Sequence, residues 1–182
     1  MPAVTRTIPR FFTTSLAREL GILLSLSVMF PFMIHLVPVP ENAQLGPRLL
    51  PMFYAPLLAV LLGRTQSALA VALLAPWLNW ALTAHPSPPS AIVMMVQLLV
   101  FVLAMRLLLP RANPGSFLAA PAYFFAMVAA VLVTAFFPDL IRGQPALAWA
   151  TQSVAIGLPG VAILVLINWL ALRSYPPGAT AA

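Results

Sequence analysis

Polar side chains that could hold a ligand stand singly in or beside long apolar segments of the sequence. They are His35, Asn79, His85, Gln97 and Gln152. Asn79 lies between Trp77 and Trp80, shortly before a proline-rich break that contains His85. An amide both donates and accepts hydrogen bonds, and indole rings supply a large apolar surface. This combination is suited to orienting a bound molecule rather than to transferring protons or attacking a bond.

The chain lacks the residue patterns of common catalytic and metal sites. Its three carboxylates, Glu19, Glu41 and Asp139, are far apart in the sequence, and it has no cysteine. No HExxH motif, paired carboxylates, catalytic-triad spacing or Walker phosphate loop is present. We therefore expect no enzyme activity, no bound metal, no cofactor and no ATP binding through a Walker loop.

The composition indicates a protein embedded in a lipid bilayer. Of the 182 residues, 62% are hydrophobic and 7% are charged, whereas soluble domains carry roughly 25% charged residues. Nine arginines against three carboxylates give a net charge of +6. The arginines lie singly between apolar segments, which fits the charge rule of membrane topology better than binding to phosphates. We expect an all-α integral membrane protein with no nucleic-acid partner.

Six apolar segments are candidates for membrane-spanning helices, which need about 20 residues each. They cover residues 20–38, 49–63, 66–84, 91–109, 116–137 and 146–172. The second is short and contains Pro51 and Pro56, so we expect it to begin with an irregular segment that protein covers. The sequence predicts a single transmembrane domain over 1–182, a six-helix bundle, with a cytoplasmic segment at 1–15 and a flexible tail at 174–182.

The arginines predict the orientation of the six spans. Seven of them fall on one side of the membrane: Arg6, Arg10, Arg18, Arg64, Arg106, Arg111 and Arg173. The other side has Arg48 and Arg142, offset by Glu41 and Asp139. Because basic residues collect on the cytoplasmic side, both termini are predicted to be cytoplasmic.

This orientation places the polar residues of the spans toward the outside. Polar side chains are costly in hydrocarbon and normally face a neighbouring helix or a cavity. We expect Asn79, Gln97 and Gln152 to face one pocket that opens to the outside, with His35 and His85 near it. The alternatives are hydrogen bonds between helices for the amides, a helix-end bond or a solvated loop for the histidines, and an interfacial belt for the tryptophans.

A stripe of small residues runs along the first span. Ala17, Gly21 and Ser25 recur at intervals of four residues, so they share one helix face. Such a face lets another helix approach closely. The approaching helix is either that of a partner protein or one of this bundle.

The order and spacing of several short motifs over residues 31–172 resemble a known family. They are Leu50-Pro51-Met52, the turn containing Leu82-Thr83 and Pro86, and Gly157-Leu158-Pro159-Gly160. In a chain with six spans they resemble the substrate-binding S component of energy-coupling factor transporters.

The resemblance implies a function. S components are six-helix proteins of prokaryotic cell membranes that capture a vitamin or other micronutrient from the outside. They carry no ATPase. Small residues of their first helix contact a transmembrane coupling subunit, which cytoplasmic ATPases drive, and they are thought to topple in the membrane to release the solute inward. Ala17, Gly21 and Ser25 would form that contact.

The sequence departs from the family pattern at positions that bear on the ligand. Phe53 stands where many relatives have histidine, Gln97 where they have glutamate, and Ala84 and His85 where they have glycine and methionine. The changes at Gln97 and Phe53 remove charge from the expected pocket, so we expect a small neutral or aromatic solute. The substrate-binding residues predicted on this basis are Asn79, Gln97, Trp80, His85, Phe53, His35 and Gln152.

Two other functions remain open from the residues alone. A membrane scaffold or assembly factor would use the small-residue stripe and would leave the polar residues as packing contacts. An intramembrane enzyme is disfavoured because no pair of ionisable groups stands at matching depth. The arrangement of Asn79, Gln97 and Gln152 distinguishes capture from scaffolding, since a capture protein needs them to converge on a cavity.

Overall fold

The computed structural model describes residues 16–36, 45–113 and 115–174, and the regular elements in these ranges are all helices. In chain order they are α1 (Leu16–His35), α2 (Leu45–Leu49), η2 (Pro51–Phe53), α3 (Tyr54–Leu61), α4 (Thr65–Thr83), α5 (Pro88–Leu108), η3 (Leu109–Arg111), α6 (Ala119–Phe136), η4 (Pro138–Ile141) and α7 (Ala146–Ser174), where η marks a short 3-10 helix. The predicted all-α class is confirmed. The predicted segment 1–15 and all but the first residue of the predicted tail 174–182 lie outside the described residues.

Several of these helices have the length and hydropathy of membrane spans. Four stretches of the described chain are long and apolar enough to cross a membrane: Leu16–Ile34, Pro88–Arg111, Ala119–Phe136 and Pro138–Ser174. A shorter apolar helix covers Pro51–Leu61. α4 is not among the four; its 19 residues include the hydrophilic Gln66 and Asn79.

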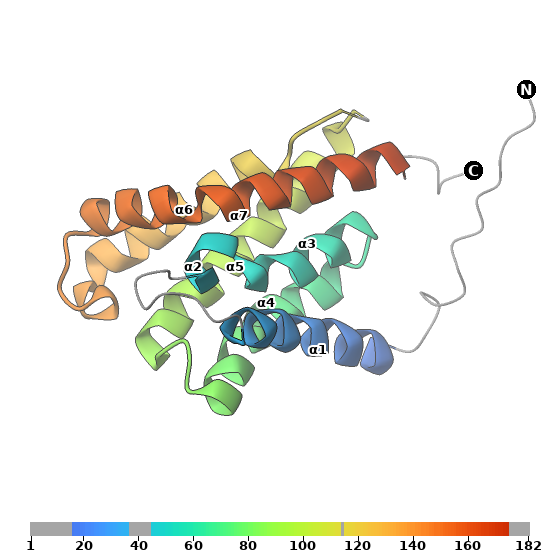
Figure 1. Cartoon of the computed structure of the whole chain (residues 1–182). Coiled ribbons are helices and arrows are strands. Elements are labelled where there is room, and N and C mark those ends of the chain that lie inside the picture. Colours follow the sequence, from blue (N-terminus) through green and yellow to red (C-terminus); the bar gives the residue numbers. More distant parts are fainter. Residues whose placement is uncertain (1–15, 37–44, 114, 175–182) are drawn as a thin grey trace, which may run out of the picture.

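The long helices pack in a series in which each contacts the next along the chain. α1 contacts α4, α4 contacts α5, α5 contacts α6, and α6 contacts α7. Figure 1 shows α6 and α7 together along one edge of the bundle and α1 along the opposite edge. α3 lies between these edges and contacts α1, α4, α5 and α7. This short helix is therefore central, and its residues Ala55, Leu57, Ala59 and Val60 are at most 1% exposed.

The backbone that leads into α3 is irregular and buried, as the prolines of the second span predict. Leu50 has a φ of 51°, a left-handed conformation that costs a residue with a side chain about 1–2 kcal/mol. The 3-10 helix that follows has a proline in its first turn, and it buries Pro51, Met52 and Phe53. Irregular backbone at membrane depth is tolerated only where protein covers it or it lines a cavity. Here α1 packs against the 3-10 helix.

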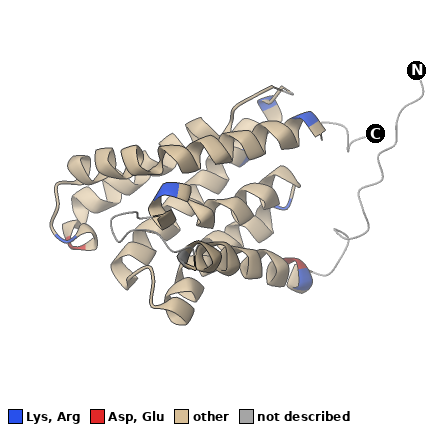
Figure 2. Cartoon of the chain, in the orientation of Figure 1, with Lys and Arg blue, Asp and Glu red and all other residues tan. Residues whose placement is uncertain are grey.

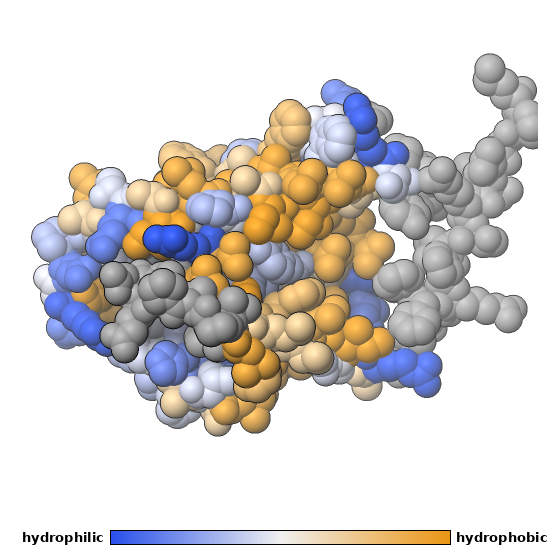
Figure 3. All heavy atoms as spheres, viewed as in Figure 1, coloured by the Kyte–Doolittle hydropathy of each residue, from blue (hydrophilic) through white to orange (hydrophobic). Residues whose placement is uncertain are grey.

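Charged residues lie toward the two ends of the bundle. Figure 2 shows the larger share of the arginines at the end where α1 begins and α7 ends. At that end, Glu19 of α1 and Arg64, which precedes α4, form an ion pair with 3.6 Å between Oε2 and Nε. Figure 3 shows hydrophobic residues across the middle of the visible face and hydrophilic ones toward both ends. An apolar band between polar ends is the surface that a bilayer requires.

Candidate functional site

Asn79 joins α4 to α1 through a carbonyl that a proline has left without its helical partner. Pro31 lies inside α1, and because proline has no N–H it cannot donate to the carbonyl of Ser27, four residues earlier. Asn79 Nδ2 donates to this carbonyl over 3.1 Å and to the Ala75 carbonyl over 2.9 Å. Asn79 is only 1% exposed, and an unpaired carbonyl in hydrocarbon is costly. The Nδ2 group of Asn79 therefore links α4 to α1.

The acceptor of the same amide has no partner among the described residues. Asn79 Oδ1 and Ser27 Oγ are both buried, and neither has a hydrogen-bond partner within the described ranges. Asn168 on α7 is also followed by tryptophan, but it uses both ends of its amide. Its Nδ2 donates to the Ser116 carbonyl over 2.8 Å, and its Oδ1 accepts from the Ala119 N–H over 3.2 Å. Buried polar atoms are normally paired, and in this respect Asn79 differs from Asn168.

Gln97 lies beside a cluster of three aromatic rings, which we call the aromatic cluster: Phe53, Phe101 and Tyr123. The Phe53 ring meets Phe101 edge to face at 5.2 Å between centroids and Tyr123 at 5.6 Å. Gln97 is one helical turn before Phe101 on α5, and its Nε2 donates to the sulfur of Met127 over 3.1 Å. Met127 is one turn after Tyr123 on α6. A thioether is a weak acceptor, so this amide can exchange its partner at little cost.

The aromatic cluster borders a close contact between α2 and α7. A Cβ added at Gly160 would lie 2.7 Å from the Leu49 carbonyl carbon, so only glycine admits the α2 backbone at this distance. A Cβ at Gly157 would lie 3.2 Å from the Tyr123 hydroxyl oxygen and 3.6 Å from the Leu50 side chain. The Tyr54 hydroxyl donates to the Leu49 carbonyl. The Gly-Leu-Pro-Gly motif thus lets α7 pack closely against the segment that leads into the aromatic cluster.

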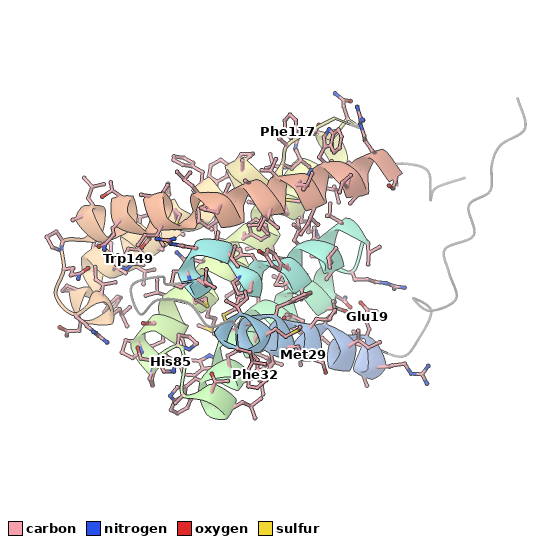
Figure 4. The ribbon with its side chains drawn as sticks, viewed as in Figure 1. Glu19, Met29, Phe32, His85, Phe117 and Trp149 are labelled. Atoms are coloured by element: carbon pink, nitrogen blue, oxygen red, sulfur yellow. The ribbon has the colours of Figure 1, made fainter. Side chains whose placement is uncertain are left out.

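The residues at the end of α4 are exposed. Trp80 is 41% exposed and packs edge to face on Trp77, with 6.3 Å between ring centroids. His85 is exposed in the connection after α4, with its Nδ1 3.2 Å from the Thr83 carbonyl oxygen. Figure 4 shows His85 and Trp149 at the end of the bundle away from Glu19. His85 therefore lies in the exposed loop that the sequence left open as an alternative to ligand binding.

The predicted binding residues therefore fall into separate environments. Phe53 and Gln97 lie together at the junction of α5 and α6, whereas Asn79 bonds across the junction of α1 and α4. The Gln152 side chain is exposed on α7. His35 is the last residue of α1, and its side chain lies outside the described part of the structure. Among the described residues, the structure brings together only part of the predicted substrate-binding set.

Sequence reasoning missed two features of this region. Tyr123 completes the aromatic cluster, and its one sequence signal is a hydroxyl inside an apolar span. The pairing of Asn79 with the carbonyl that Pro31 frees leaves no local signal, because Ser27 and Asn79 are 52 residues apart.

The small-residue stripe is on the outside of the bundle. Ala17, Gly21 and Ser25 are all exposed, and a Cβ at Gly21 would meet nothing within 4 Å. The stripe is therefore not used for packing among the described helices, and no described residue covers this face of α1.

Comparison with protein-family models, with curated proteins and with solved structures finds no match to this chain. Within the described ranges, no three His, Asp or Glu side chains come together as metal ligands would. The chemistry that the aromatic cluster and Gln97 offer is hydrogen bonding by an uncharged amide next to aromatic rings.

Proposed function

We propose that this protein is the solute-capture subunit of an energy-coupling factor transporter in a prokaryotic cell membrane. The observation that carries the proposal is the open small-residue stripe of α1, which has the form of a contact for another membrane helix. In this proposal the solute binds against the aromatic cluster, next to the irregular buried segment at Leu50.

In this proposal the chain crosses the membrane six times. The segment from α2 to α3 and the helix α4 act as the second and third spans, in addition to the four helices of full length and hydropathy. Arginines gather where α1 begins and α7 ends, and the positive-inside rule makes that end cytoplasmic. Both termini are then in the cytoplasm, and His85 and Trp149 face the outside.

The solute that suits this region is small and uncharged, with an aromatic or amide-like group. Phe53, Phe101 and Tyr123 offer aromatic edges and faces, and none of them carries a formal charge. An ionised solute would be buried without a partner, which costs several kcal/mol. The Gln97 amide, next to the aromatic cluster, would fix the orientation of the solute by directed hydrogen bonds.

Release of the solute would depend on a partner. A ligand shifts a conformational equilibrium only by its differential affinity for the two states, so a tightly bound solute leaves when work is done on the protein. The stripe Ala17, Gly21 and Ser25 would dock on a transmembrane coupling subunit, and cytoplasmic ATPases would drive that subunit.

A membrane scaffold or assembly factor is the second candidate, and one observation favours it. The donor of Asn79 is engaged between α1 and α4, and that of Gln97 between α5 and α6. If both amides serve only to hold helices together, the protein needs no solute, and the stripe alone is its working surface.

Native mass spectrometry separates the two candidates. The protein is purified in mild detergent from cells grown in rich medium, together with Gln97→Leu and the matched control Gln66→Leu, which changes an exposed amide at the start of α4. We expect a small molecule on the wild type and on the control that is lost from Gln97→Leu. Folded wild-type protein without any bound molecule would favour the scaffold.

The partner contact is tested by co-purification with the coupling module of an energy-coupling factor transporter. Gly21→Leu places a bulky side chain in open space, so folding should be unchanged, while the close helix approach is blocked. Ala155→Leu makes the same kind of change at an exposed position of α7 and serves as the control. Equal recovery of the module with both variants would remove the stripe from the proposal.

A further inference from the structure

The junction between α1 and α4 contains all the buried side-chain nitrogen and oxygen atoms that lack a hydrogen-bond partner in the described part of the chain. They are Glu19 Oε1, Ser27 Oγ and Asn79 Oδ1. Glu19 and Ser27 are about two turns apart on α1, and Asn79 lies on α4. The unpaired polar groups are therefore concentrated where these two helices meet.

Ser27 is unpaired although a bond within its own helix is available to a hydroxyl. A serine or threonine inside a helix often donates to the carbonyl four residues earlier, and Thr134 of α6 does so to Ala130 over 2.8 Å. Ser27 is 0% exposed, and its Oγ makes no such bond. Its hydroxyl is therefore left for a partner that does not belong to α1.

The unpaired groups of Ser27 and Asn79 belong to residues that already touch. Asn79 Nδ2 donates to the Ser27 carbonyl over 3.1 Å, which holds the two side chains at the same level of the junction. The amide oxygen only accepts hydrogen bonds, whereas the hydroxyl both donates and accepts. Water matches both groups, and buried water molecules typically bond about three otherwise unpaired polar atoms.

The ion pair at the end of this junction also points to water. The distance between Glu19 Oε2 and Arg64 Nε is 3.6 Å, whereas a direct charge-assisted bond measures about 2.7–2.9 Å. The Glu19 side chain is only 11% exposed, and its second oxygen is one of the unpaired atoms. A polar contact of this length often has a water molecule within it.

We propose that the α1–α4 junction is hydrated, with a water molecule bound between Ser27 Oγ and Asn79 Oδ1. The inference does not depend on solute capture and holds for a scaffold as well. A buried oxygen without a partner is costly, and the water offsets part of that cost at both atoms. The junction then differs from that of α6 and α7, where Asn168 makes direct bonds with both ends of its amide.

Hydrogen exchange of an introduced thiol tests whether water reaches this site. The sequence has no cysteine, so the S–H stretching band in the infrared spectrum of Ser27→Cys reports that position alone. On mixing with heavy water, the band should move promptly to the S–D frequency. The matched control is Thr134→Cys, at a buried position whose hydroxyl bonds carbonyls of its own helix. It should exchange far more slowly, because the helices must first open, and equally slow exchange of both thiols would overturn the proposal.

Thermal unfolding in detergent gives an independent test. If water links the two side chains, Ser27→Ala should lower the unfolding midpoint, because a hydrogen bond is lost. In the Asn79→Leu background the same change should raise the midpoint, since the hydroxyl there has already lost its bridge to the amide and is costly to bury. A rise in both backgrounds, or an equal fall in both, would overturn the proposal. Ser25→Ala, at an exposed position of α1, is the control and should leave both midpoints unchanged.

The occupant is distinguished from a metal ion by the choice of salt. Carbonyl and side-chain oxygens inside a membrane protein also coordinate Na⁺, so the wild type is unfolded in sodium chloride and in choline chloride at equal concentration. We expect the same midpoint in both salts. A midpoint that sodium raises in the wild type but not in Asn79→Leu would show that a cation occupies the site in place of water.

Discussion

The bond from Asn79 to the Ser27 carbonyl predicts an energetic coupling between Asn79 and Pro31. Replacing Pro31 by alanine restores an N–H that can donate to Ser27 within α1, so the carbonyl no longer needs the amide. Asn79→Leu should therefore cost more in the wild type than in the Pro31→Ala background. An unsatisfied buried carbonyl costs about 1–3 kcal/mol, and interhelical hydrogen bonds in membranes average about 0.6 kcal/mol with a maximum near 1.7. We expect a coupling of about 1–1.5 kcal/mol.

A double-mutant cycle with Pro31→Ala and Asn79→Leu is more informative than the variant Asn79→Leu alone. Asn79→Leu loses the bonds of Nδ2, which destabilises the protein, and also removes the buried Oδ1 that lacks a partner, which stabilises it. Its own effect on the free energy of unfolding therefore combines a loss and a gain. That gain is common to both backgrounds and cancels in the coupling energy. The assay is reversible unfolding by sodium dodecyl sulfate in mixed micelles, followed by circular dichroism, on the wild type, both single variants and the double variant.

A second proline inside a helix provides the control. Pro159 lies in α7, which is not the helix that Asn79 bonds, so Pro159→Ala and Asn79→Leu should be additive within about 0.3–0.5 kcal/mol. A coupling near zero between Pro31→Ala and Asn79→Leu would refute the reasoning, because the Ser27 carbonyl would then be satisfied in another way.

Three further predictions concern the same bundle and the same unfolding assay. Gly160→Ala should destabilise by up to about 2 kcal/mol, because overpacking against the Leu49 backbone costs about 1–3 kcal/mol and the helix propensity of alanine returns about 1; Gly157→Ala, whose Cβ would meet side chains rather than backbone, should cost less, and equal effects would contradict the contact with α2. Ala84 has a φ of 58°, so Ala84→Gly should stabilise by about 1 kcal/mol, and no gain in the unfolding midpoint would count against that conformation. Asn168→Leu should destabilise by about 2–3 kcal/mol, since two backbone groups lose their partners, and a milder effect than that of Asn79→Leu would be the unexpected result.

Much of the fold was predictable because its signals are local. The lengths of the apolar segments predicted the long helices. Pro51 and Pro56 predicted an irregular start to the short second span. The stripe of α1 was visible as a pattern, but whether it faced inward or outward depended on how the helices pack. The six spans and their orientation rest on the arginines and stay predictions.

The candidate site was less predictable because its residues depend on distant partners. Asn79 and Asn168 have nearly the same neighbours, Leu-Asn-Trp and Ile-Asn-Trp, yet only Asn79 retains an open acceptor. The difference comes from Pro31 in one case and from the backbone before α6 in the other, and neither is adjacent in the sequence. Similarly, Gly160 was noticed as part of a motif, while its purpose became clear only from the backbone of α2.

The short central helix has a consequence for how the protein is made. At 1.5 Å per residue, the stretch Pro51–Leu61 extends about 16 Å, roughly half of a hydrocarbon core of about 30 Å. A nascent chain cannot leave so short a segment alone in lipid, because its terminal peptide groups would lose water without gaining partners. We therefore expect the insertion machinery to retain α3 until α4, which follows after three residues, has been synthesised, and to release the two as a hairpin that α5 and α7 enclose later.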